Sequence, residues 1–384
     1  MSSPAGHGRH FGAGARLIAA LSVSWCAACA PAAASAPQLD SALLRARTTV
    51  GAPAATATVM ACGRVVWAGA SGVYAQGSPR PVTPQTRFIL ASATKSVTAT
   101  MIMQQVQAGR LSLSTRLARF YPRLPNAARI TLRMLLNHTS GLADYFDNPR
   151  INNIVSNQPR HHWTRQEVIS AIGRPQFPPG ARFLYTNTNY VVLGGILEKV
   201  TGKPVETYFQ RAVARPAGMR LSTFTYRPAR SAAWFPHPYA LNGDGSLTDD
   251  WVPGYGISSD YWGPVWGDGG LASTATDLAR FGQALFRGRL VSRATLAQMT
   301  AVGPHDYGLG IYDQRFDGHR WLGHEGSYGG FESENWTDPI RQVTVTITTN
   351  LDEPDSAADT ISDRIWRAVV NAYDGLPGPR PACR

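Results

Sequence analysis

The chain has 384 residues, of which 43% are hydrophobic and 16% charged, which is enough for two domains or one large domain in two parts. Its net charge is +12, but the arginines are scattered and no nucleic-acid-binding motif appears, so we interpret them as a solvated, arginine-rich surface. This charge favours at most a weak association with the anionic polymers of the cell envelope. Beyond the N-terminal region no apolar run reaches the roughly 18 residues of a membrane-spanning helix, so we expect no transmembrane helix in the mature chain.

The N-terminal region has the pattern of an export signal. Arg9 and Arg16 precede the apolar run LIAALSVSWCAACA, and the small residues AAASA that follow suit a signal peptidase. We therefore expect residues 1–36 to be a signal peptide and the mature protein to be secreted or periplasmic. The alternative is a lipid anchor on Cys29, which is disfavoured because Cys26 occupies the position where a lipobox usually has Leu.

The mature chain keeps two cysteines, Cys62 and Cys383. An even pair in an oxidising compartment favours one disulfide, which would tie an early turn to the C-terminal tail. Two unpaired thiols are the alternative, although an exposed cysteine in a turn makes it less attractive.

The first predicted elements are strands. ATATVMA and RVVWAGA flank Cys62-Gly63, which is the pattern of a hairpin. RFIL predicts a short strand that leads into a helix from Ser92 to about Ala108, which Gly109 ends.

The middle of the chain, from about Leu111 to Trp266, has a helical texture with long loops. Thr164 and Glu167 form a capping-box pattern for a helix over QEVISAIG. From Trp234 to Trp266 the chain is rich in aromatic residues and glycine. This segment is interpreted either as a wall of an apolar substrate cleft or as a loop that packs its own rings.

Strands return in the last third of the chain. A capped helix over TATDLARFGQALF precedes three strand-like segments, HRWLGHE, GGFESENW and QVTVTITTN. In the last of these, apolar residues alternate with threonines, so one face is apolar. A closing helix carries apolar residues four positions apart at Ile361, Ile365, Val369 and Tyr373.

This order of elements predicts an α+β fold. Strands at both ends and helices between them indicate an antiparallel sheet assembled from both termini, flanked by helices and carrying an inserted, mostly helical lobe. We expect a single domain over residues 37–384, with a sheet lobe at 37–110 plus 267–384 and a helical lobe at 111–266.

Ser92 and Lys95 are the first candidates for chemistry. Lysine occurs only three times among 37 basic residues, and unlike arginine it can lose its proton in a protein. On a helix, residues three apart share one face, so an amine with a depressed pKa would lie beside a serine hydroxyl near the positive end of the helix dipole. Alone, Ser-x-x-Lys is a weak pattern that also fits an N-cap serine beside a surface lysine.

Two further motifs accompany Ser-x-x-Lys in order: Tyr185-Thr186-Asn187, and His324-Glu325-Gly326 on a predicted strand. With LLNHTSGL, RPAGM, GGLASTATDLARF and YGLG between and around them, the chain resembles the serine β-lactamase and D-alanyl-D-alanine carboxypeptidase family, in the branch of class C β-lactamases and esterase-like relatives. The resemblance spans about Thr56 to Tyr373. It implies the β-lactamase/transpeptidase-like fold, with the active site between the two lobes.

The resemblance implies the catalytic roles residue by residue. Ser92 would attack a carbonyl and become acylated, while Lys95 and Tyr185 would share the proton transfers. Which of these two is the resting base stays open. The backbone N–H groups of Ser92 and Ser327 would form the oxyanion hole.

The same resemblance implies the substrate-binding residues. Asn187 would bind the substrate and help to hold Lys95, His324 would give the cleft a positive or hydrogen-bonding edge, and Gly326 would also contact the substrate. For His324 the alternative is a structural histidine whose hydrogen bonds are satisfied.

Glu325 departs from the family pattern, which usually has a small residue there. Because neighbouring strand residues face opposite sides, Glu325 is expected either to point away from the cleft or to repel an anionic substrate end. This favours ester, amide or D-amino-acid peptide substrates over those of a true β-lactamase or D,D-carboxypeptidase. A catalytically silent envelope binding protein is the alternative from another class.

The sequence contains no sign of a metal or cofactor. There is no Gly-x-Ser-x-Gly elbow and no phosphate-binding glycine loop, His324-Glu325 lacks a second zinc-binding histidine, and His161-His162 is a lone pair. We therefore expect a metal-independent serine hydrolase.

Overall fold

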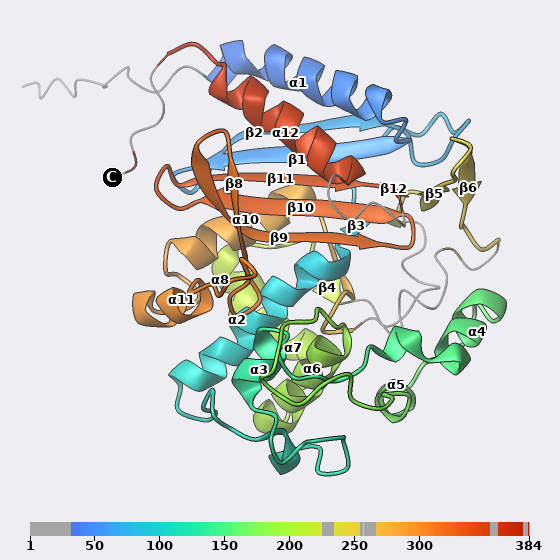
Figure 1. The fold of residues 1–384 in the computed structure, drawn as a ribbon. Helices are drawn as coiled ribbons and strands as arrows, with labels where there is room; N and C mark the ends of the chain where they lie inside the picture. The colour runs from blue at the N-terminus through green and yellow to red at the C-terminus, as the bar shows by residue number, and fades with distance from the viewer. Residues whose placement is uncertain are drawn as a thin grey trace, which may run out of the picture.

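The structure is a computed structural model that describes residues 32–224, 234–253, 256, 266–353, 360–378 and 383. Its largest sheet has six strands, and each neighbouring pair is antiparallel. The strand order is β2 (Arg64–Gly72), β1 (Ala54–Ala61), β11 (Val343–Thr349), β10 (Phe331–Asp338), β9 (His319–Tyr328) and β8 (Tyr312–Phe316). Strands from the two ends of the chain thus lie side by side in one sheet (Figure 1), and the predicted α+β fold is confirmed.

β1 and β2 form the predicted hairpin around Cys62 and Gly63. Both turn residues have positive φ, 54° and 81°, as a two-residue turn matched to the twist of the strands requires. The Cys62 N–H donates to the carbonyl of Gln342 (3.0 Å), and the Gly63 N–H donates to the side chain of Gln283 (2.8 Å). The turn is therefore anchored to the β10–β11 connection and to α10 (Ala275–Phe286).

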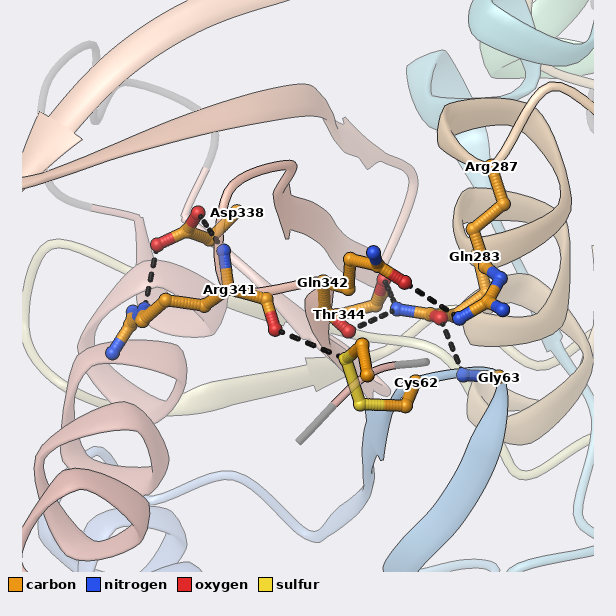
Figure 2. The surroundings of a disulfide bond; sticks show 9 residues. Cys62, Gly63, Gln283, Arg287, Asp338, Arg341, Gln342 and Thr344 are labelled. Carbon is orange, nitrogen blue, oxygen red and sulfur yellow. Dashed lines mark hydrogen bonds and ion pairs between the residues drawn. A yellow bond between two sulfur atoms is a disulfide. The ribbon is translucent and has the colours of Figure 1, made fainter. Parts of the chain in front are cut away.

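The same turn meets the C-terminal tail at Cys62 and Cys383 (Figure 2). The two sulfurs are joined in the structure, and the Cα atoms are 5.1 Å apart, within the range that a disulfide needs. Gln283 also donates to the carbonyl of Gln342 (2.9 Å) and to the hydroxyl of Thr344 (3.0 Å), which fixes the neighbouring turn. Formation of this bond in the folded protein stays a prediction, because it depends on the redox compartment.

Two terminal helices cover one face of the sheet, α1 (Ala32–Thr49) and α12 (Ile361–Asp374) (Figure 1). α12 is the predicted closing helix, and its buried Trp366 packs edge-to-face on Trp321 with ring centres 5.0 Å apart. The core between helices and sheet includes Leu39, Leu43, Val345, Ile347, Ile365 and Val369. This is the apolar face that the alternating sequence of β11 predicts.

The threonine face of β11 is buried as well. Thr344 bonds to Thr337 across the sheet (2.7 Å), and Thr348 bonds to Thr56 (2.8 Å). Further along, Thr58 of β1 bonds to Thr276 of α10 (2.9 Å). Paired hydroxyls thus satisfy this layer between the sheet and α10, so the polar face of the alternation is a second interior.

A second core lies below the sheet in Figure 1, around α2 (Thr94–Gln107) and α6 (Thr188–Thr201). Shorter helices complete this region: α3 (Leu132–Leu136), α4 (Pro149–Asn157), α5 (Arg165–Ser170), α7 (Val205–Phe209), α8 (Arg215–Ala217) and α11 (Arg293–Met299). α5 begins at the predicted capping box on Thr164. Because α2 packs in the same core as α6, the division into lobes at residue 110 stays a prediction.

Two three-stranded sheets join these layers. One contains β3 (Phe88–Ile89), β7 (Leu271–Ser273) and β4 (Thr223–Phe224), and the other contains β12 (Leu351–Asp352), β5 (Tyr239–Leu241) and β6 (Leu247–Asp249). β3 is the predicted strand before Ser92, and the Leu90 N–H after it donates to the carbonyl of Leu271 (2.9 Å). Within the described residues, no helix is long and apolar enough to cross a membrane.

Candidate active site

Ser92 lies at the junction between β3 and α2. It is the middle residue of a single 3-10 turn (Ala91–Ala93) that precedes α2. Ala91 has a positive φ of 44°, an unusual backbone conformation for a non-glycine residue, which turns the chain sharply at this point. Ser92 is partly exposed, whereas Ala91 and Ala93 are buried. The turn therefore presents the one hydroxyl side chain of this segment to the outside.

Lys95 is fully buried one helical turn later and points back at Ser92. Its Nζ is 2.9 Å from the Ser92 hydroxyl, 2.8 Å from the side-chain oxygen of Asn187 and 2.9 Å from the carbonyl of Asp268. Burial lowers the pKa of Lys95 to about 8, although the carboxylate of Asp268 acts in the opposite direction. At neutral pH a measurable fraction of this amine is therefore uncharged and able to accept a proton.

Asp144 orients Asn187. One Asp144 oxygen accepts from both the Asn187 backbone N–H (2.7 Å) and its side-chain amide (3.1 Å). With its N–H₂ group held in this way, the amide oxygen of Asn187 must face Lys95. The structure thus joins the predicted residues Ser92, Lys95 and Asn187 into one hydrogen-bonded chain.

Asp268 lies on the other side of Lys95 and is also buried. Its carboxylate accepts from the Trp266 N–H (2.7 Å) and from the Tyr145 hydroxyl (2.9 Å). Burial raises the pKa of Asp268 to about 6, and the charge of Lys95 opposes that rise. No local pattern in the sequence indicates that Asp144 and Asp268 belong to the site, because their contacts with Asn187, Lys95 and Tyr145 join segments far apart in the chain.

Tyr185 is a third titratable group beside Ser92 and Lys95. The Lys95 amine lies 5.0 Å from the centre of the Tyr185 ring. The ring is partly exposed, but the hydroxyl oxygen is buried, and it makes no well-formed hydrogen bond to any residue that the structure describes. Burial raises the pKa of Tyr185 well above its usual value of 10, against an opposing effect of the Ser92 hydroxyl. Tyr185 therefore keeps its proton in the resting site.

His138 supports Tyr185 from behind. The two rings stack with centres 4.3 Å apart and an angle of 25° between them. The Nδ1 atom of His138 lies 3.1 Å from the Thr186 N–H and 3.2 Å from the side-chain amide of Asn189, so it acts as an acceptor. Burial holds the pKa of His138 well below its usual value, so the ring is neutral. Sequence reasoning noted the surrounding LLNHTSGL segment but not this contact.

His324 is fully buried and has both ring nitrogens engaged. Nδ1 lies 2.6 Å from the carbonyl of Glu325 and therefore donates, so Nε2 accepts from the Tyr307 hydroxyl at 3.1 Å. Burial lowers the pKa of His324 to about 3. The ring is thus a neutral wall of the site, so the positive edge that was one of the two expected roles of His324 is wrong, because burial keeps the ring uncharged. Tyr307, in the YGLG segment, is a partner that sequence reasoning did not assign.

Glu325 follows the strand alternation only in part. It pairs in register with Glu334 of β10, whose carboxylate accepts from the Ser362 hydroxyl at the start of α12 (3.0 Å), on the face opposite to α2. However, the Glu325 side chain is 36% exposed, and its carboxylate lies 3.4 Å from Nδ1 of His324. The carboxylate therefore bends towards the edge of the sheet beside His324 and keeps partial access to solvent. Partial burial raises the pKa of Glu325 to about 6, so most of this carboxyl is still ionised at pH 7.

Gly326 is the point at which β9 meets the nucleophile turn. A Cβ atom built on it would lie 2.2 Å from the carbonyl oxygen of Leu90 and 2.7 Å from the amide nitrogen of Ser92. Only glycine permits this approach. The approach places the Ser92 N–H beside Gly326 of β9, and Ser327 is the next residue of that strand. The two predicted oxyanion-hole donors, the N–H groups of Ser92 and Ser327, therefore lie on segments that are in contact.

The aromatic segment from Trp234 to Trp266 is described only in part, since residues 254–255 and 257–265 lie outside the described residues. Of the described rings, Trp251 stacks on His237 at 4.2 Å, and Trp266 is buried beneath the guanidinium of Arg165. The Trp251–His237 stack lies within the segment, as expected of a loop that packs its own rings, whereas Trp266 packs against Arg165 of α5. For the rest of the segment, the choice between a cleft wall and a loop that packs its own rings stays untested.

Comparison with known proteins gives a consistent result. The Beta-lactamase family model matches residues 40–369. The chain is 29% identical to Penicillin-binding protein 4* of Bacillus subtilis over 72% of this chain and 64% of that protein. It is 24% identical to a D-aminopeptidase of Cereibacter sphaeroides over 86% of this chain and 62% of that protein. The chain thus spans less than two thirds of the length of these curated relatives.

A solved structure extends the likeness to three dimensions. The D-amino acid amidase of Ochrobactrum anthropi SV3, in a complex with L-phenylalanine amide, superposes with a TM-score of 0.74 at 25% identity. The match covers 88% of this chain and 98% of the amidase chain. The fold likeness and the family model therefore point to one group of proteins.

Proposed function

Because the chain belongs to the β-lactamase family of serine hydrolases, we propose that it hydrolyses amide and ester bonds of D-amino-acid derivatives through an acyl-enzyme on Ser92. The support for covalent catalysis is the placement of an amine with a lowered pKa 2.9 Å from the Ser92 hydroxyl. The support for the substrate class is the likeness to a D-aminopeptidase and to a D-amino acid amidase.

In the acylation step the Ser92 oxygen attacks the carbonyl carbon while its proton passes to the neutral amine of Lys95. Lys95 rather than Tyr185 is the resting base, because burial depresses the pKa of the amine and raises the pKa of the phenol. The backbone N–H groups of Ser92 and Ser327 stabilise the developing oxyanion. Tyr185 then gives its proton to the leaving nitrogen or oxygen and recovers one from Lys95.

Deacylation repeats these transfers with water. A water molecule attacks the ester carbonyl, its proton passes to the Tyr185 and Lys95 pair, and the Ser92 oxygen regains a proton as the acid leaves. Asn187, held by Asp144, keeps Lys95 directed at Ser92 during both steps.

The third motif favours a substrate that does not present a carboxylate to β9. His324 is buried and neutral, and its neighbour Glu325 carries the accessible charge of this motif. A neutral ring and a carboxylate do not attract an anionic substrate end. This is the observation on which the choice of amide and ester substrates rests.

β-Lactamase or D,D-carboxypeptidase activity is the second candidate, because the complete set Ser92, Lys95, Tyr185 and Asn187 converges here and one relative is called a penicillin-binding protein. A silent binding protein is disfavoured, because such a protein has no need for a buried amine directed at a serine hydroxyl. Export, by a signal peptide at residues 1–36 or a lipid anchor on Cys29, is part of the proposal. Those residues lie almost wholly outside the described part of the chain, and the Cys62–Cys383 geometry is the feature that supports an oxidising compartment.

A parallel assay separates the candidates. D-Alaninamide, D-phenylalanine methyl ester and benzylpenicillin are each incubated with the protein and with the Ser92→Ala variant, and loss of substrate is followed together with the intact protein mass. We expect turnover of the amide and the ester that Ser92→Ala abolishes, with neither a lasting penicillin adduct nor loss of the drug. A lasting adduct would identify a penicillin-binding peptidase, and rapid loss of the drug would identify a β-lactamase.

A further inference from the structure

Glu325 lies on the part of β9 that follows the end of its pairing with β8. β8 pairs with β9 only as far as Gly323, opposite Tyr312. From His324 to Tyr328, the strand pairing among the described residues is with β10 alone. The backbone that borders Ser92 thus has an open side, and the Glu325 carboxylate is on it.

This carboxylate has no cationic partner in the described part of the chain. Among the described residues, the basic side chain in contact with this carboxylate is His324, whose Nδ1 lies 3.4 Å away. That ring is held neutral, because one nitrogen donates to a carbonyl and the other accepts from Tyr307. The other carboxylates that adjoin the site are bound by backbone or side-chain donors, Asp144 by Asn187 and Asp268 by Trp266 and Tyr145.

The charge of Glu325 acts on the reacting groups. It is among the charges that raise the pKa of Lys95, of Tyr185 and of Tyr312, so its field reaches both proton-transfer residues. Within the site, Lys95 is the balancing cation, and it must be neutral when Ser92 is activated. An additional positive charge supplied by a substrate would therefore be favourable at this edge.

We infer that Glu325 binds the free α-ammonium group of the acyl part of the substrate, so that the site selects amino-acid amides and peptides with an unblocked N-terminus. The inference rests on the proposed function. In such a substrate the ammonium is bonded to the carbon next to the carbonyl that Ser92 attacks. With the carbonyl oxygen directed at the N–H groups of Ser92 and Ser327, the substituents of that carbon lie along β9, where Glu325 is.

The ammonium takes part in binding but not in bond-making. Ser92 forms the ester and the amide C–N bond breaks, and the Ser92 proton ends on the leaving amine by way of Lys95 and Tyr185. Blocking the α-amine by acetylation removes the charge and leaves the reacting bond unchanged. Comparison of a free and an acetylated substrate therefore isolates the interaction that Glu325 provides.

The test uses D-phenylalanine p-nitroanilide and its N-acetyl derivative at pH 7, where most of the α-amine is protonated. We expect the full-length protein to prefer the free amine, and Glu325→Gln to lower kcat/KM for it by about tenfold more than for the acetylated compound, a loss typical of one charged contact. Glu353→Gln is the matched control, because its carboxylate is already paired with Arg364 at 2.7 Å. This control should leave the preference unchanged.

The outcomes separate this inference from the proposed function. Equal losses on both substrates, or a wild-type protein indifferent to acetylation, would overturn the role of Glu325 while leaving the Ser92 mechanism in place. If neither anilide is cleaved, the affinity of the site for the two forms of the substrate is measured instead. The Ser92→Ala variant and the double variant Ser92→Ala with Glu325→Gln are each titrated with D-phenylalaninamide and with its N-acetyl form. Tighter binding of the free amine that depends on Glu325 supports the inference, and equal or absent binding contradicts it.

Discussion

At the scale of single residues, we expect the protonation of Lys95 to set the pH range of activity. Burial lowers its pKa to about 8, and the neutral amine is the form that can accept the Ser92 proton. Activity should therefore rise with pH and level off above about 8, because the inactive, protonated form is lost as the pH passes the pKa. The pH dependence of kcat/KM for a neutral ester measures this. A flat profile between pH 6 and 9 would exclude Lys95 as the base, and Lys95→Arg, which cannot lose its proton, should be inactive at every pH.

Tyr185 allows a second test at this scale. Tyr185→Phe removes the buried hydroxyl and keeps the ring that stacks on His138. We expect kcat to fall by about a hundredfold to ten-thousandfold, as for the loss of a general acid–base group, with little change in thermal stability. The paired measurement is a melting curve and a kcat for each protein. A large loss of stability would instead assign Tyr185 a structural role.

The sequence predicts the motif residues of this site but not the residues that hold them. Ser92, Lys95 and Tyr185 can be recognised because their motifs are defined by residue spacing and by order along the sequence, and both can be seen without a structure. Asp144 and Tyr307 contact Asn187 and His324, which are 43 and 17 residues away, and the Asp268 carbonyl accepts from Lys95, 173 residues away. Such contacts depend on packing, and no local pattern carries them.

At the scale of elements, β9 and the turn that carries Ser92 form one unit through Gly326. Gly326→Ala would place a Cβ atom 2.2 Å from the carbonyl oxygen of Leu90, so the strand and the turn must separate. We expect a loss on the order of a hundredfold in kcat/KM, because the nucleophile and the oxyanion donors lose their alignment, and a loss of about 1–3 kcal/mol in the free energy of unfolding.

Gly243→Ala is the control for this variant. Gly243 has no heavy atom near the position of an added Cβ, and its φ is not positive. Both proteins are compared by steady-state kinetics and by urea unfolding. Wild-type activity in Gly326→Ala would show that the close approach of β9 is not needed for catalysis.

Elements with strong local signals are the ones that sequence reasoning placed well. The hairpin at Cys62-Gly63, the capped helices at Thr164 and Thr274 and the strand before Ser92 all occur as predicted. The burial of the threonine face of β11 could not be predicted in this way. It results from α10, a distant part of the sequence, which supplies Gln283 as a partner of Thr344 and Thr276 as a partner of Thr58 on the neighbouring strand β1.

At the scale of the whole molecule, the Cys62–Cys383 bond connects the first hairpin to the tail across 321 residues. A cross-link over so long a loop restricts the unfolded chain, and we expect Cys62→Ser with Cys383→Ser to lower the free energy of unfolding by about 2–4 kcal/mol. Chemical unfolding of the exported protein and of the double variant gives this value. Activity should be preserved in the double variant, since neither sulfur adjoins Ser92.

Thiol counting shows whether the bond forms. The unfolded, unreduced mature protein should contain no free thiol. Two reactive thiols per chain would contradict the disulfide and weaken the case for export, and a reducing agent should then have no effect on stability.

The central claim is a covalent intermediate on Ser92, and the most direct test is the intact mass of the protein quenched with acid during turnover of p-nitrophenyl acetate. We predict a population heavier by one acetyl group, located on Ser92 by peptide mapping and absent from Ser92→Ala, which should no longer hydrolyse the ester. Turnover without an adduct, an adduct on another residue, or full activity in Ser92→Ala would contradict the account.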